Sequence, residues 1–314
     1  QRQMCIRDRD KAAAEVELYP DGKLEVRSSS AEIGQGLVTV LQMIVAEELS
    51  VPVTSVRVLL SDTDLTPDGG PTTASRQTYV TGNAARGAAQ TLRQAIATTL
   101  AEKFDQPPDE VQFVEGLAQV DGHAIPLGDV VADMKSEGRD PRVSYVYWAP
   151  ETSPLGENGN MHFAYSFAAQ AAEVEVNMFT GEVSVLRVIA ANDVGKAINP
   201  LGLQGQIEGG VVMGLGNALT EEFIIENGQV ITDRLARYRI PTIIQSPEII
   251  SIVVEHPAVS GPYGAKGVGE LSSIPTTPAI TNAIYNAVGV RIHHLPVDQE
   301  YLLEKMNEKG SNST

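Results

Sequence analysis

An internal duplication constrains what this chain can fold into more than any other feature of its sequence. Residues 13–27 alternate polar and apolar side chains on both sides of an Asp-Gly turn, which predicts a β-hairpin. Residues 171–190 repeat this pattern around a Thr-Gly turn, and each copy is followed by a Gly-Gln pair at the start of a predicted helix, Gly34-Gln35 and Gly205-Gln206. Chance seldom repeats elements in the same order, so we expect two related structural units.

The length of 314 residues allows two modest domains, each with a sizeable core. We place the first over residues 11–150 and the second over residues 151–308, on either side of a linker rich in Pro, Gly and polar residues. Helices and strands alternate but hairpins are frequent, which favours an α+β fold. We expect two related α/β subdomains with mixed sheets, and not a doubly wound parallel sheet. Residues 309–314 are expected to form a frayed tail.

Hydrophobic periodicity predicts the other elements. After Gly36, apolar residues recur at the spacing of one buried helical face, from Leu37 to Val45. Further helices are predicted over residues 82–104, 127–134, 206–216, 278–288 and 298–305. Strands are predicted over residues 56–60, 143–148 and 249–255, and hairpins about Asp121-Gly122 and Asn227-Gly228.

The first ten residues are unlike the rest of the chain. Residues 3–8, Gln-Met-Cys-Ile-Arg-Asp, resemble the conceptual translation of a transposon-end sequencing adapter. We therefore expect residues 1–10 to be a non-native leader, and the reading frame to begin inside a longer gene. A charged natural N-terminus is the alternative.

Composition excludes several classes of function. The net charge of −17 would repel a phosphate backbone, so nucleic acid is not expected as a partner. One Cys excludes a disulfide framework and a Cys-based metal site, and no pair of His residues has the spacing of a zinc site. The apolar runs are too short to span a membrane, and no export signal is visible, so cytoplasm is the default location.

Four segments at element boundaries concentrate glycine and polar residues: Gly34-Gln35-Gly36, Asp62–Gln77, Gly205–Gly210 and Gly261–Glu270. Glycine allows a ligand to approach the backbone closely, and a loop as long as residues 62–77 is usually functional or disordered. Each segment also has a purely structural reading. The first and third could be turns that start a helix, and the second could be an ordered surface loop.

The fourth segment ends in a single carboxylate, Glu270, after four glycines in nine residues. Apolar Leu271 follows, so we expect Glu270 to be partly desolvated. Burial raises the pKa of a carboxylate and suits it to general-base catalysis near neutral pH. An acid in the first turn of a helix is the alternative, which composition does not reject.

Five segments together resemble the molybdenum hydroxylase family, which includes xanthine dehydrogenase and aldehyde oxidase. They occur in the family's order and span nearly the whole chain after residue 10. One such motif would be weak evidence, but five in register identify the chain as similar to the C-terminal part of the family's molybdopterin-binding large subunit. The segments are Glu32–Gly36, Gly70–Gln77, Gly205–Gly209, Tyr238–Pro241 and Gly264–Glu270.

The resemblance implies a molybdenum–molybdopterin cofactor, in the cytosine dinucleotide form that bacterial members often use, with no metal ligand from the protein. Glu270 matches the family's catalytic base, and Gln35 and Gln206 match positions beside the molybdenum. The other positions that match cofactor-binding residues are Gly34, Gly36, Thr72, Thr73, Ala74, Ser75, Arg76, Gln77, Lys266, Gly267, Val268 and Gly269.

The reaction implied by the resemblance is hydroxylation of an aromatic N-heterocycle, such as a purine, or of an aldehyde, with water as the oxygen source. Electrons would pass to an iron–sulfur subunit and an FAD subunit, in an assembly such as a dimer of heterotrimers. Carbon monoxide oxidation, hydroxybenzoyl-CoA reduction and non-catalytic pterin binding are the alternatives on the same scaffold. The family's N-terminal pocket residues are absent here, so the fragment alone is expected to be inactive.

Overall fold

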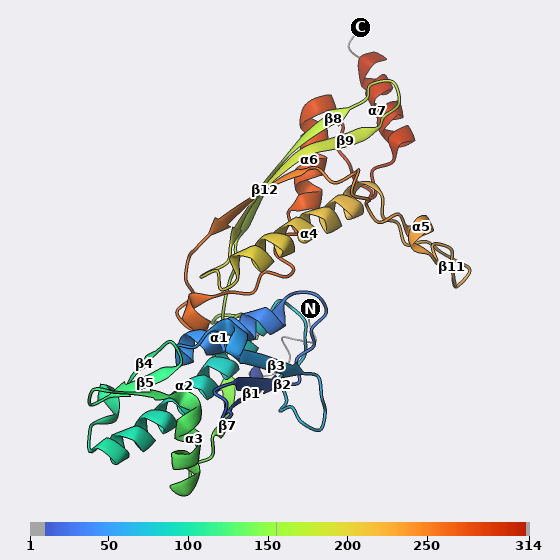
Figure 1. Cartoon of the computed structure of the whole chain (residues 1–314). Coiled ribbons are helices and arrows are strands. Elements are labelled where there is room, and N and C mark those ends of the chain that lie inside the picture. The colour runs from blue at the N-terminus through green and yellow to red at the C-terminus, as the bar shows by residue number, and fades with distance from the viewer. Residues whose placement is uncertain (1–9, 155, 312–314) are drawn as a thin grey trace. The chain divides into compact units, whose positions relative to one another are not determined.

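The computed structural model of the chain describes residues 10–154 and 156–311 (Figure 1). Most of the predicted leader therefore lies outside the described residues. The chain divides into two compact units. Unit 1 comprises the described residues up to Tyr165 together with Gly195–Pro200 and His256–Gly267; unit 2 comprises Ser166–Val194, Leu201–Glu255 and the described residues from Val268 onward.

Unit 1 contains a four-stranded sheet with the strand order β3-β2-β1-β7. Strand β1 (Lys11–Leu18) is antiparallel to β2 (Leu24–Ser28) and to β7 (Arg142–Trp148), whereas β3 (Val56–Leu60) runs parallel to β2. Every second side chain of β1 is buried, which is the period expected of a strand with one face on the core. The sheet is therefore mixed, as the sequence predicts.

Two long helices cover the core of unit 1. Helix α1 (Leu37–Leu49) buries the apolar face expected from its periodicity, and α2 (Gln77–Phe104) contacts α1, β1 and β7. The remaining elements of this unit are η1 (Val53–Ser55), η2 (Pro108–Glu110), β4 (Gln112–Val114), β5 (Leu117–Val120), β6 (His123–Pro126), α3 (Leu127–Ser136) and η3 (Pro262–Gly264).

Unit 2 contains a three-stranded sheet with the order β12-β9-β8. Strand β8 (Ala168–Val176) is antiparallel to β9 (Val183–Asp193), and β12 (Glu248–Val254) is parallel to β9. Helix α6 (Thr276–Val288) contacts β8. The other elements are α4 (Pro200–Leu219), β10 (Ile225–Glu226), β11 (Gln229–Val230), α5 (Leu235–Tyr238) and α7 (Gln299–Ser311), which extends into the predicted tail.

The two units repeat one topology, so the predicted α+β fold with an internal duplication is confirmed. Each begins with an antiparallel hairpin, β1-β2 or β8-β9. A helix follows, then a strand parallel to the second strand of the hairpin, and then a helix that contacts the first strand. The duplication thus extends beyond the hairpin and first helix that the sequence reveals.

The division into units differs from the predicted boundary at residue 150. Unit 1 continues to Tyr165 and also contains two segments from the second half of the sequence. A contiguous division was expected because composition marks linkers along the chain but does not reveal a later segment that packs against an earlier unit.

Candidate functional site

Each repeat contains a strand–helix–strand unit with two parallel strands, β2-α1-β3 in unit 1 and β9-α4-β12 in unit 2. In open α/β sheets, ligands bind in loops at the carboxyl ends of such strands. The turn Gly34-Gln35-Gly36 follows β2, the segment Thr72–Gln77 follows β3, and Lys266–Glu270 follows β12. The topology therefore places three of the four candidate segments where a ligand is expected.

The turn Gly34-Gln35-Gly36 needs its glycines. Gly34 has φ 97° and Gly36, the N-cap of α1, has φ 86°, and this backbone conformation favours glycine. Space is not the reason, because a Cβ at either position would meet no atom within 4 Å. The side chain of Gln35 folds back on its own loop: Nε2 donates to Ala31 O at 2.9 Å, and Oε1 accepts from Ile33 N at 2.7 Å. In the described part of the chain, these bonds leave the second amide N–H of Gln35 for another acceptor.

The carboxylate of Glu32 holds this turn. Oε1 accepts hydrogen bonds from the backbone N–H groups of Gly34 (2.8 Å) and Gly36 (3.0 Å), and Oε2 accepts one from Val38 (2.9 Å). Burial alone would raise the pKa of Glu32, but the backbone donors outweigh it and hold this pKa below its ordinary value. The sequence motif includes Glu32, but no sequence signal assigned it a role.

The loops after β2 and β3 are tied together by polar contacts. Thr72 Oγ1 accepts hydrogen bonds from Ala31 N at 2.8 Å and from Gln77 Nε2 at 3.0 Å. Gln77 Nε2 also donates to Pro71 O, and its Oε1 accepts from Ser30 Oγ at 2.9 Å and from Thr81 Oγ1. Gln77 therefore has all its hydrogen-bonding groups engaged by the protein.

The loop after β3 has an unusual backbone at its centre. Ala74 (φ 51°) and Ser75 (φ 56°) both adopt the left-handed conformation, which non-glycine residues seldom do in succession. Such strain is often found at ligand sites. A Cβ on Gly267 would overlap the carbonyl oxygen of Ser75, so the predicted segments around Ser75 and Gly267 contact each other within unit 1.

Arg76 does not offer a free cation to a ligand. It is 7% exposed, and each of its five N–H groups has a protein acceptor. Nε and Nη2 bind both carboxylate oxygens of Asp10 at 2.7 and 2.9 Å, Nη1 donates to the carbonyls of Gly69 and Pro71, and Nη2 also donates to Lys11 O. Arg76 thus fixes the loop, and its carboxylate partner Asp10 is the last residue of the predicted leader.

The glycine-rich segment after β12 lies against residues 195–196 in unit 1. Lys196 N donates to Gly264 O at 3.0 Å, and a Cβ on Gly195 would overlap the same oxygen. Lys266, two residues later, is 7% exposed. Close approach of the two backbones therefore requires glycine at position 195, where φ is also 69°.

Gln206 lies inside α4 and not at its start. The helix begins at Pro200, a residue favoured in the first helical turn, so the predicted start at residue 206 is wrong. Gln206 is half-buried, and a Cβ on Gly205 or Gly209 would meet no atom within 4 Å. As at Gln35, the glutamine has glycine beside it that faces open space.

Glu270 lies in a turn of unit 2 that packs on α4. Its carbonyl accepts hydrogen bonds from Ser273 N and Oγ at 3.2 and 3.0 Å, and Ser272 Oγ donates to Gln206 O at 3.3 Å. The side chain of Glu270 is exposed, so the expected partial desolvation is not observed. The helix reading is also not observed, because α6 begins at Thr276.

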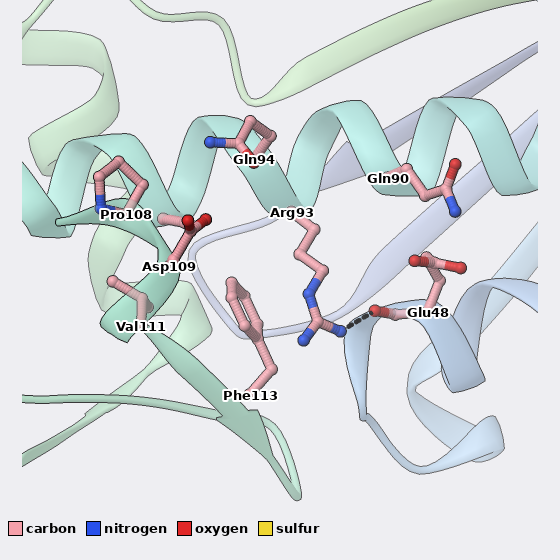
Figure 2. A pocket seen from close by; sticks show the side chains of 9 residues that line it. Glu48, Gln90, Arg93, Gln94, Pro108, Asp109, Val111 and Phe113 are labelled. Carbon is pink, nitrogen blue, oxygen red and sulfur yellow. Dashed lines mark hydrogen bonds between the residues drawn. The ribbon is translucent and has the colours of Figure 1, made fainter.

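The pocket in Figure 2, about 340 Å³, lies elsewhere in unit 1. It is lined by residues of α2, the last turn of α1 and the segment that carries Phe113; in it Arg93 Nη1 donates to Glu48 O at 2.6 Å. Glu48 lies in the last turn of the 13-residue helix α1, so a helical rise of about 18 Å separates it from Gly36. None of the predicted site residues lines this pocket.

Two structural features are absent from the described residues. Residues 10–154 and 156–311 contain no group of three or more His, Cys, Asp or Glu side chains that could hold a metal ion. Within the same residues, no helix combines the length and apolar character needed to cross a bilayer.

A family model described as the molybdopterin cofactor-binding domain matches residues 2–247. The chain belongs to this family. It is 33% identical over 306 residues to a xanthine dehydrogenase molybdenum-binding subunit of Escherichia coli O157:H7, covering 95% of this chain and 40% of that protein. It is also 33% identical over 300 residues to the 6-hydroxypseudooxynicotine dehydrogenase complex subunit gamma of Paenarthrobacter nicotinovorans, covering 92% of this chain and 37% of that protein.

Among solved structures, this molybdopterin cofactor-binding chain is similar to quinoline 2-oxidoreductase from Pseudomonas putida 86. The TM-score is 0.82 at 27% identity, over 95% of this chain and 38% of that one. The chain thus spans about two fifths of the length of its relatives.

Proposed function

We propose that this chain is the C-terminal, cofactor-binding part of the large subunit of a molybdenum hydroxylase. Family membership supports the cofactor, and one structural observation carries its location. In both repeats a glutamine, Gln35 or Gln206, stands beside glycines that face open space. A large planar ligand can approach a backbone closely only where side chains are absent. The residues present therefore fit a pterin.

The chain's own residues would divide the work of holding this cofactor. Gln35 and Gln206 would lie beside the molybdenum, and their amides can donate or accept hydrogen bonds there. The backbone of Thr72–Ser75 and of Lys266–Gly269 would line the pterin, which we expect in its cytosine dinucleotide form. When bound, the cofactor supplies the two-electron redox chemistry, and the protein supplies position and proton transfer.

Glu270 would act as the general base. Glu270 is an exposed residue, so water can reach it. A carboxylate within hydrogen-bonding reach can accept a proton from the water that becomes the product's oxygen. The turn that carries Glu270 packs on α4 beside Gln206, so a proposed base and a proposed cofactor contact are held by the same unit.

We propose an aromatic N-heterocycle as the substrate, with an aldehyde as the second class. The relatives named for xanthine and quinoline act on N-heterocycles, which favours the first class. Electrons would leave through an iron–sulfur subunit and an FAD subunit, in an assembly such as a dimer of heterotrimers, in the cytoplasm. The substrate, the partner subunits, the assembly and the location are properties of the complete enzyme.

The test is the variant Glu270→Gln in the complete subunit, assembled with its partner subunits. We expect molybdenum and pterin contents to stay at the wild-type level while turnover of a purine or an aldehyde falls by about 10²- to 10⁴-fold, because the proton acceptor is lost. The matched control is Glu226→Gln, an exposed acid in the small β-hairpin of unit 2. Wild-type turnover in Glu270→Gln would contradict the proposed mechanism.

A further inference from the structure

The turn that carries Gln35 has little stiffness of its own. Gly34 and Gly36 on either side of it have positive φ, and glycine is the residue with the most conformational freedom to lose. A Cβ added to either glycine would have no neighbouring atom within 4 Å. A side chain placed by this turn needs a restraint from elsewhere.

Glu32 supplies that restraint on both sides of Gln35. One carboxylate oxygen accepts the N–H of Gly34, before Gln35, and the N–H of Gly36, after it. The other oxygen accepts the N–H of Val38, in the first turn of α1. These are charge-assisted bonds from an acceptor-only group, which are stronger than neutral ones.

The contacts are more than those of an ordinary helix cap. A capping side chain usually belongs to the N-cap residue and binds the second or third N–H of the helix. Here the N-cap is Gly36, which has no side chain, and the carboxylate comes from four residues earlier. It binds one helical N–H, that of Val38, and two N–H groups of the turn itself.

The same turn is anchored to the loop after β3. Gln35 Nε2 donates to Ala31 O, and Ala31 N donates to Thr72 Oγ1. The backbone at residue 31 therefore links the amide of Gln35 to the Thr72–Gln77 segment, while Glu32 fixes the backbone on either side of Gln35. Both restraints favour the orientation of the Gln35 amide that the structure shows.

We propose that Glu32 is a positioning residue that acts on the reaction through Gln35, holding its amide in the orientation that the bound cofactor requires. This inference rests on the proposed function, since it gives Gln35 its role. In this role Glu32 acts through the backbone of the turn, to which its carboxylate is bound.

The first experiment uses the cofactor-free chain and does not depend on activity. Glu32→Gln keeps the size of the side chain but replaces one acceptor oxygen by an NH2 group. This group only donates, so it cannot accept a hydrogen bond from Val38 N or from the turn amides, whichever of them it faces. We expect hydrogen exchange of the amides of residues 34–38 to accelerate about tenfold or more. The control Glu47→Gln, at the exposed far end of α1, should leave these rates unchanged. Equal exchange in Glu32→Gln and wild type would overturn the proposed restraint.

The second experiment is a double-mutant cycle in the complete enzyme, with Glu32→Gln, Gln35→Ala and both together. We expect Glu32→Gln to keep its molybdenum and to lower kcat about tenfold, and to cause no further loss in the Gln35→Ala background. Additive losses, unchanged kcat, or loss of molybdenum in Glu32→Gln would each overturn the inference. None of these outcomes bears on Glu270→Gln, so the proposed function is judged separately.

Discussion

At the scale of single residues, the polar side chains of the candidate loops have two different roles. Arg76 has all five N–H groups bound by protein acceptors, and Gln77 has its amide fully engaged, so both build the frame of the loop after β3. Gln35 Nε2 donates to one acceptor in the described residues, Ala31 O, and we propose that its second N–H binds the cofactor. Matching a family motif does not separate these roles, because frame and ligand-binding residues occur in the same short segment.

Replacement of Arg76 tests this division. Arg76→Lys keeps the charge but offers three donors from a single atom, which cannot reach the Asp10 carboxylate and three carbonyls at once. We expect the free energy of unfolding to fall by about 2–4 kcal/mol, measured as a lower urea midpoint at unchanged slope. Arg234→Lys, at an exposed arginine, should change it by less than about 0.5 kcal/mol. Equal midpoints for the two variants would show that the network around Arg76 contributes nothing.

At the scale of secondary-structure elements, the repeated strand–helix–strand unit explains where the candidate segments lie. Parallel strands joined by a helix have their carboxyl ends at one edge, and the long loops that leave this edge carry the glycines. The loops are then held by close backbone contacts, of which that between Gly267 and the carbonyl of Ser75 is the tightest in unit 1. Such a contact tolerates no side chain.

Two glycine-to-alanine changes should therefore act in opposite directions. Gly267→Ala must separate the two loops, and we expect it to lower the free energy of unfolding by about 1–3 kcal/mol. Gly205→Ala, in the interior of α4 with open space around it, should raise this free energy by up to about 1 kcal/mol, because alanine favours the helix. Urea unfolding of the cofactor-free chain measures both. A neutral or stabilising Gly267→Ala would refute the contact.

At the scale of the whole molecule, the two units have separate hydrophobic cores. One large cluster of buried side chains belongs to unit 1, whereas two smaller clusters belong to unit 2. The chain covers only about two fifths of the relatives' length, so the activity that we propose is that of a longer subunit and its partners. Stability, in contrast, can be measured on the chain itself.

Separate cores predict separate unfolding. Trp148, the single tryptophan of the sequence, lies in β7, so its fluorescence reports on unit 1, while circular dichroism reports on the helices and strands of both units. Because the smaller clusters bury less apolar surface, we expect unit 2 to unfold first. The circular dichroism transition should therefore begin at lower urea concentration than the fluorescence transition. Coincident transitions would mean that the units unfold as one.

Local sequence patterns predicted most of the helices and strands and their order. The helix from Leu37, the hairpins at Asp121-Gly122 and Asn227-Gly228, and the duplicated order of hairpin and helix all follow from periodicity and turn residues. These signals depend on neighbours a few positions apart, so they can be read along the chain. The resemblance to molybdenum hydroxylases rests on local motifs too, and the family match confirms it.

Contacts between segments that are distant in the sequence became visible in the folded structure alone. Asp10 pairs with Arg76 across 66 positions, and Gly267 lies against Ser75, although no local pattern marks either contact. The exposure of Glu270 was also decided there, because an apolar neighbour in sequence does not cover a side chain in space. Hydrogen bonds and burial depend on the path of the whole backbone, whereas periodicity records only which face of an element is apolar.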